Sequence, residues 1–175
     1  MSDAIAPLLM NSGYDFSIGT DYEVTVSLDP KKWATKKEYN KISKEKWKTV
    51  KYLNSKGTES SDFKGIPDDV GGVFMWVIRP RMVPQNAVSV VAYIGEAEKG
   101  ILGTVKQFIY SIGKMYTGDA FAKNLFDTYS EDLFLTYYED EKTVEKSKVC
   151  KDLNDVLSPP IHYIQGSLAI EGEEM

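Results

Sequence analysis

The sequence predicts a mixed α/β (α+β) protein with a small, mainly antiparallel sheet of three strands flanked by helices. Three observations support this class. Short runs rich in β-branched and aromatic residues recur from residue 73 onward, as expected of strands. Apolar residues at helical spacing separate these runs. The 175 residues are 42% hydrophobic and 27% charged, which is enough apolar material for a buried core.

The first elements expected are a strand and a lysine-rich helical segment, which together form an N-terminal extension. Residues 21–28 alternate apolar and polar side chains, the period of a half-buried strand. Asp29 and Pro30 then have the character of a helix N-cap and first helical residue. We expect the lysine-rich segment to form one broken helix or two short ones as far as about Leu53. The polar, Gly/Ser-rich residues 54–69 predict a loop leading to the main body.

The main body is expected to begin with two strands, at residues 73–78 and 88–94, joined by a connection at 79–87. Residues 101–114 then predict a helix, because five apolar residues fall on one face: Ile101, Val105, Phe108, Ile109 and Ile112. A second helix is expected at 119–129, with Phe121, Leu125 and Phe126 inward.

The last elements expected are a third strand at residues 133–138 and a helix at 144–157. In that helix Val149, Leu153 and Val156 should be buried, and Pro159-Pro160 should end it. We therefore divide the chain into an extension (1–65), a main domain (66–165) and a flexible acidic tail (166–175).

Composition excludes several kinds of site. Cys150 is the only cysteine and His162 the only histidine. Internal disulfides, zinc sites made of several thiolates and metal sites made of several histidines are therefore excluded. No apolar run approaches the roughly 18 residues of a membrane span, and the N-terminus lacks the basic region of a signal peptide. We expect a cytoplasmic protein with no membrane partner.

Charge is distributed unevenly. Residues 31–56 contain ten lysines and two glutamates, whereas the rest of the chain carries 11 basic and 24 acidic side chains. This cluster has two interpretations. In the first, it contacts nucleic acid through lysines such as Lys36, Lys41, Lys44 and Lys48. In the second, it is a solvated face whose aromatic residues turn inward. The excess of acidic residues in the rest of the chain favours the second interpretation.

Two tripeptides carry a family resemblance. Gly72-Val73-Phe74 and Tyr93-Ile94-Gly95 each fall on an expected strand, about twenty residues apart. Together with IPDDVGGVFMWVI, AYIGEAEKGILGTVKQF and LNDVLSPPIH, they resemble the GIY-YIG nucleases over residues 66–162. The resemblance implies a fold in which both tripeptide strands belong to one sheet, and a divalent metal ion that assists phosphodiester cleavage.

The family's functional positions carry altered side chains in this chain. Phe74 stands where the family has its first motif tyrosine, and Tyr93 retains the second. Thr104 falls at the phosphate-binding arginine, and no arginine follows Arg81. Cys150 falls at the metal-binding glutamate, with Lys151 there if the alignment shifts by one residue. His162 takes the place of an asparagine that packs the site together.

These substitutions predict a catalytically inactive GIY-YIG-like binding protein with no cofactor. Its partner is expected to be a nucleic acid or a protein that processes nucleic acid, and an inhibitor or a phage or other anti-defence factor is one form of this function. The alternative is a DNA endonuclease with a rearranged site. It would use Mg²⁺ or Mn²⁺ held by carboxylates such as Glu96, Glu98 or Asp152. The sequence leaves the oligomeric state and any residual activity open.

Overall fold

The computed structural model describes residues 29–81, 89–114, 120–140, 144–159 and 161. Its centre is an antiparallel sheet of four strands in the order β1-β4-β2-β3. The strands are β1 (Trp47–Lys51), β2 (Gly72–Ile78), β3 (Val90–Ala97) and β4 (Leu133–Glu139). The mixed α/β class is therefore confirmed, with one strand more than expected.

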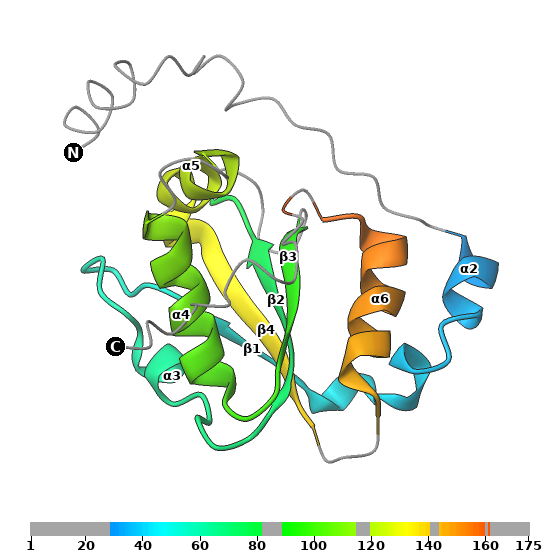
Figure 1. Ribbon diagram of the computed structural model, residues 1–175. Helices are drawn as coiled ribbons and strands as arrows, with labels where there is room; N and C mark the ends of the chain where they lie inside the picture. The colour runs from blue at the N-terminus through cyan, green and yellow to red at the C-terminus, as the bar shows by residue number, and fades with distance from the viewer. Residues whose placement is uncertain (1–28, 82–88, 115–119, 141–143, 160, 162–175) are drawn as a thin grey trace, which may run out of the picture.

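Helices lie on both faces of the sheet (Figure 1). One face is covered by α4 (Ile101–Lys114), α5 (Ala120–Thr128) and the short α3 (Ser61–Lys64). The other is covered by α6 (Lys146–Leu157), with α2 (Pro30–Ala34) beyond it. Short 3₁₀ turns complete the described elements at Tyr39–Lys41, Lys44–Lys46 and Ser130–Asp132. Each face of the sheet therefore has its own hydrophobic layer.

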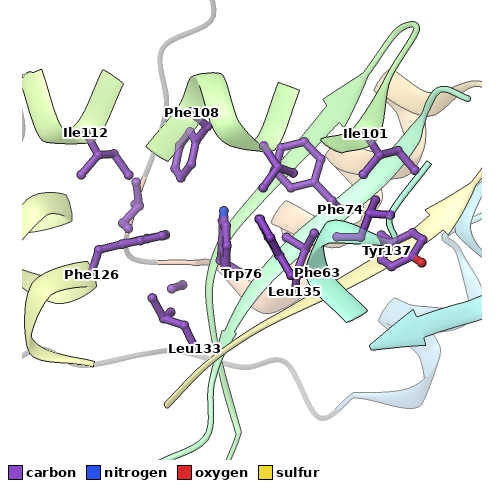
Figure 2. Packing of buried hydrophobic residues seen from close by; sticks show 14 of the residues in the cluster. Phe63, Phe74, Trp76, Ile101, Phe108, Ile112, Phe126, Leu133, Leu135 and Tyr137 are labelled. Atoms are coloured by element: carbon purple, nitrogen blue, oxygen red, sulfur yellow. The ribbon is translucent and has the colours of Figure 1, made fainter. Parts of the chain in front are cut away.

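The larger layer lies between the sheet and α4 and α5 (Figure 2). Phe74 and Trp76 project into it from alternate positions of β2, as the two-residue period of a strand requires. Trp76 is fully buried and packs edge-on against Phe126 of α5, with ring centroids 5.2 Å apart. Phe63 of α3 is equally buried in the same layer.

The smaller layer lies between the sheet and α6. Val73 of β2 and Ile94 of β3 meet Val149 and Leu153 there. These last two residues, together with Val156, are the α6 positions that the sequence predicted to be buried, and all three are buried. Burying a Val or Leu side chain contributes about 1.5–3 kcal/mol. The apolar stripe of α6 therefore holds the helix on the sheet.

Several local predictions are confirmed. Asp29 caps α2 through a hydrogen bond from the Lys31 amide (2.9 Å), and Pro30 occupies the first turn. The predicted helix at residues 101–114 matches α4 in its bounds, and the predicted helices at 119–129 and 144–157 match α5 and α6 within two residues. α6 ends before Ser158, whose left-handed backbone precedes Pro159. Phe126 is buried as predicted.

One local prediction was wrong. The lysine-rich segment was expected to be helical to about Leu53, but Trp47–Lys51 is β1 and pairs with β4. Thr49 and Val50 are β-branched and Trp47 is aromatic, so this stretch favours a pleated surface. Pairing with β4 then outweighs the helical preference of the surrounding lysines.

The polar stretch at residues 54–69 contains α3, which begins at its N-cap Ser60. Through β1 and Phe63, residues before 66 contribute to the same sheet and core as the residues after it. Three predictions fall outside the described part of the chain: the strand at residues 21–28, the inward side chains of Phe121 and Leu125, and the tail at residues 166–175. No helix among the described residues is both long and apolar enough to cross a membrane.

Candidate functional site

The two motif strands lie side by side. β2 and β3 pair antiparallel, with Phe74 opposite Gly95 and Trp76 opposite Tyr93. The rings of Phe74 and Tyr93 are 6.0 Å apart, and Tyr93 stacks on Phe108 of α4 at 4.2 Å. A side chain at Gly95 would place its Cβ 2.7 Å from both the Phe74 and the Tyr93 ring. Glycine there permits this ring cluster.

A pocket of about 370 Å³ opens along β3, between α4 and α6. It brings together Phe74, Tyr93, Thr104 and Cys150, four of the five positions assigned from the family resemblance. The fifth, His162, lies outside the described residues. The remaining lining residues are Ile94, Gly95, Glu96, Gln107, Phe108, Ser147, Lys151 and Asn154. One place in the fold therefore collects residues from four elements, β2, β3, α4 and α6.

Thr104 reaches the pocket because the start of α4 is fixed by the loop before β2. The amides of Ile101 and Leu102 donate to the carbonyls of Val70 and Pro67, each at 3.2 Å. The Asp68 carboxylate accepts from the Gly103 amide at 2.7 Å. The Thr104 hydroxyl donates to the Gly100 carbonyl at 2.8 Å. Thr104 thus brings no positive charge to the pocket, and its proton is directed to its own helix.

Cys150 enters the pocket from α6 as a neutral thiol. Burial, and to a smaller extent the Glu96 carboxylate, raises the pKa of this thiol to about 12. A thiolate is the form that binds metals or attacks electrophiles. At neutral pH Cys150 therefore acts as a small apolar wall residue.

The carboxylates considered as relocated metal ligands do not gather in the pocket. Asp152 accepts hydrogen bonds from the backbone amides of Glu38 and Tyr39, both at 3.2 Å, and so binds the lysine-rich segment to α6. Glu96 lines the pocket, whereas Glu98 is not among its lining residues. Within the described ranges no three His, Cys, Asp or Glu side chains form a group suited to a metal ion.

Three of the four lysines chosen as nucleic-acid contacts pair with carboxylates. Lys36 contacts Asp155 of α6 at 2.5 Å, Lys41 contacts Glu38 at 2.6 Å, and Lys48 contacts Glu139 of β4. Lys44 is exposed in the second 3₁₀ turn. None of the four lines the pocket.

The aromatic residues of the lysine-rich segment turn inward. Trp33, Tyr39, Trp47 and Tyr138 form a continuous series of ring contacts, with centroids 5.5 to 6.4 Å apart. The first three pack on the α6 side of the sheet, and Tyr52 packs against Phe63 and Trp76 on the opposite side. In the described part of this segment, the aromatic residues therefore pack against the two hydrophobic layers of the sheet.

Comparisons with protein-family models, with curated proteins and with solved structures find no match.

Sequence reasoning missed several polar pocket residues. Gln107 lies three residues after Thr104 on α4, and Ser147 and Asn154 lie three before and four after Cys150 on α6. Residues three or four apart share one face of a helix. The sequence signal for these residues was their spacing, because it places each of them on the same helix face as Thr104 or Cys150.

Proposed function

We propose that this chain is a non-catalytic, GIY-YIG-like binding protein that acts on a nucleic acid or on a protein that processes nucleic acid. The observation that carries the proposal is the pocket at β3. Four positions assigned from the resemblance converge there, but the side chains at the arginine and glutamate positions are a hydroxyl and a partly buried, protonated thiol. A phosphoryl-transfer site needs a fixed cation and metal-holding oxygen atoms. Thr104 and Cys150 provide neither.

Charge favours a protein partner over a nucleic acid. The charged side chains that line the pocket are Glu96 and Lys151, one of each sign. Three of the four candidate lysines already pair with carboxylates. Outside residues 31–56 the chain carries 24 acidic and 11 basic side chains. A surface that binds phosphates needs an excess of cations, so we place protein first among the two partners.

A cleavage assay tests whether the protein is catalytic. The purified protein is incubated with plasmid and with single-stranded DNA, in Mg²⁺ and separately in Mn²⁺. We expect cleavage no greater than that by a Thr104→Ala/Cys150→Ala variant. Metal-dependent cutting that Tyr93→Phe abolishes would overturn the proposal and favour the rearranged endonuclease.

A retention assay separates the two partner classes. We expect weak DNA retention by the wild type, and replacing Lys36, Lys41, Lys44 and Lys48 together by alanine should leave it unchanged. A steep loss of DNA retention and of its salt dependence would instead assign these lysines to phosphate binding, because each neutralised phosphate releases counterions. The matched control replaces Lys64, Lys106, Lys123 and Lys148, an equal loss of charge on other elements.

A further inference from the structure

The pocket contains part of β3, a strand at the edge of the described sheet. β3 is last in the order β1-β4-β2-β3 and, among the described strands, pairs with β2 alone. An edge strand directs every second backbone N–H and C=O away from the sheet, and these groups can pair with another chain. The register of the sheet decides which residues of β3 do so.

The register of β2 against β4 fixes this alternation. The Gly71 carbonyl accepts from the Asp140 amide at 2.8 Å, and the Arg79 amide donates to the Asp132 carbonyl at 2.9 Å. Bonded pairs alternate along an antiparallel ladder. The odd-numbered residues of β2 therefore bond with β4, and the even-numbered residues bond with β3.

The same alternation determines the outward residues of β3. Gly95 and Tyr93 lie opposite the even-numbered Phe74 and Trp76, so their backbone groups face β2. The backbone of Ile94, between them, therefore points away from the sheet. No described residue outside the sheet forms a hydrogen bond with the Ile94 amide or carbonyl.

The chain already uses this edge next to the pocket. The Ile161 amide donates to the Ala92 carbonyl at 3.1 Å, and the Ile161 side chain is buried in the core on the α4 side. The described contact therefore ends at Ala92, and the pocket begins at the following residue, Tyr93. This hydrogen bond shows that the Ala92 carbonyl, on the edge of the sheet, accepts a backbone donor from outside the sheet.

The walls of the pocket suit a segment whose side chains alternate. Tyr93 and Gly95 face the larger hydrophobic layer, on the side of α4, and Ile94 faces the smaller layer, on the side of α6. Lys151 lines the pocket from α6, is exposed, and forms no ion pair within the described part of the chain. A ligand carboxylate at Lys151 would therefore form a new ion pair.

We propose that the pocket binds an extended peptide segment of a partner protein, added as a further strand at Ile94 with an acidic side chain placed at Lys151. Backbone hydrogen bonds supply affinity in this mode, and side-chain pockets supply specificity. This inference rests on the proposed function in one respect, that the partner is a protein.

The first test locates the peptide. A phage-displayed library of random linear peptides is selected against the purified protein, and the best binder is synthesised with a fluorescent label. We expect Lys151→Glu to weaken its binding about tenfold or more, since like charges then oppose each other. The control Lys148→Glu changes the same charge on α6 outside the pocket and should change affinity by about twofold or less. Equal effects of both variants, or no selected peptide, would contradict the assignment.

The second test addresses strand addition and requires no change in the protein. Single N-methyl groups are introduced along the peptide backbone. Because strand pairing uses alternate amides, methylation should abolish binding at every second position and be tolerated between them. Hydrogen exchange of the Ile94 amide should slow about tenfold when peptide binds. Uniform tolerance of methylation, with unchanged Ile94 exchange, would reject strand addition.

The two proposals fail in distinguishable ways. Metal-dependent DNA cleavage that needs Tyr93 would overturn the non-catalytic function, whatever peptides bind. A peptide that binds equally well to Lys151→Glu and tolerates every N-methyl group would overturn strand addition and leave the non-catalytic function intact.

Discussion

At the scale of single residues, Gly95 shows how the motif strands build the pocket. It lies opposite Phe74 in the sheet, and its missing side chain leaves room for the rings of Phe74 and Tyr93. Both rings line the pocket. The role of this glycine is therefore close packing, because its Cβ would collide with rings in a packed layer.

Gly95→Ala should destabilise the protein by about 1–3 kcal/mol, the usual cost of overpacking. The new Cβ would lie 2.7 Å from two ring atoms, and the buried Phe74 ring has little room to move. Urea unfolding measures the effect. Gly65→Ala is the matched control, since the nearest atoms to its Cβ are at 3.5 Å. Equal stability of the two variants would contradict this account of the ring cluster.

Cys150 should make stability depend on alkaline pH. Burial raises its pKa to about 12, whereas an unfolded cysteine has a pKa of about 8.5. The unfolded chain therefore loses this proton first, and the free energy of unfolding falls as pH rises between these values, by up to about 1.4 kcal/mol per pH unit.

The measurement is urea unfolding from pH 7 to 10 for the wild type and for Cys150→Ala. Above about pH 8.5 the free energy of unfolding of the wild type should fall relative to that of Cys150→Ala. The reason is that only the wild type has the thiol whose unfolded form loses its proton first. Alkylation of the native thiol by iodoacetamide should also be slow at pH 8, and fast in urea. A difference that stays constant with pH would contradict a partly buried thiol that is protonated in the folded state.

At the scale of elements, Asp152 fixes the lysine-rich segment to α6. Its carboxylate accepts from two consecutive amides, those of Glu38 and Tyr39. Glu38 in turn accepts from the Glu145 amide at 3.3 Å. These bonds orient Tyr39 within the aromatic series between α2 and β4.

Asp152→Ala should lower the free energy of unfolding by about 1–3 kcal/mol, because two partly buried amides lose their acceptor. It should also speed hydrogen exchange at Glu38 and Tyr39. The control Glu145→Ala removes the exposed pair with Lys148 and should cost about 0–1 kcal/mol. The same cost for both, with unchanged exchange, would contradict an anchoring role for Asp152.

The success of the sequence prediction also varied by element. α4 and α6 were predictable, because each buries one stripe of residues, and that stripe is visible at helical spacing. β1 was not, because WKTVK is short and its preference is decided by pairing with β4, which is more than eighty residues away. Thr104 and Cys150 were placed by resemblance, whereas the role of Asp152 as an anchor depends on a contact between distant segments.

At the scale of the whole molecule, residues on both sides of position 66 build one sheet. β1 covers the outer edge of β4, and Phe63 is fully buried in the core of the α4 side. A fragment that begins at residue 66 would expose both the β4 edge and the Phe63 site.

Residues 66–175 alone should therefore fail to fold cooperatively, whereas residues 29–175 should fold. The two fragments differ only in residues 29–65, so the comparison isolates β1, α3 and the lysine-rich segment. Thermal unfolding by circular dichroism and the dispersion of amide NMR signals measure the outcome. A folded, cooperative 66–175 fragment would contradict the view that residues 29–65 belong to the core.

The central claim is that the pocket at β3 is a binding site without a catalytic metal. A titration with Mn²⁺, followed by amide NMR, tests it most directly, because a bound paramagnetic ion broadens signals from nearby amides. We predict no saturable broadening at Tyr93, Gly95, Thr104 and Cys150 at millimolar Mn²⁺. Saturable broadening centred on these residues, removed by Glu96→Gln, would contradict the claim.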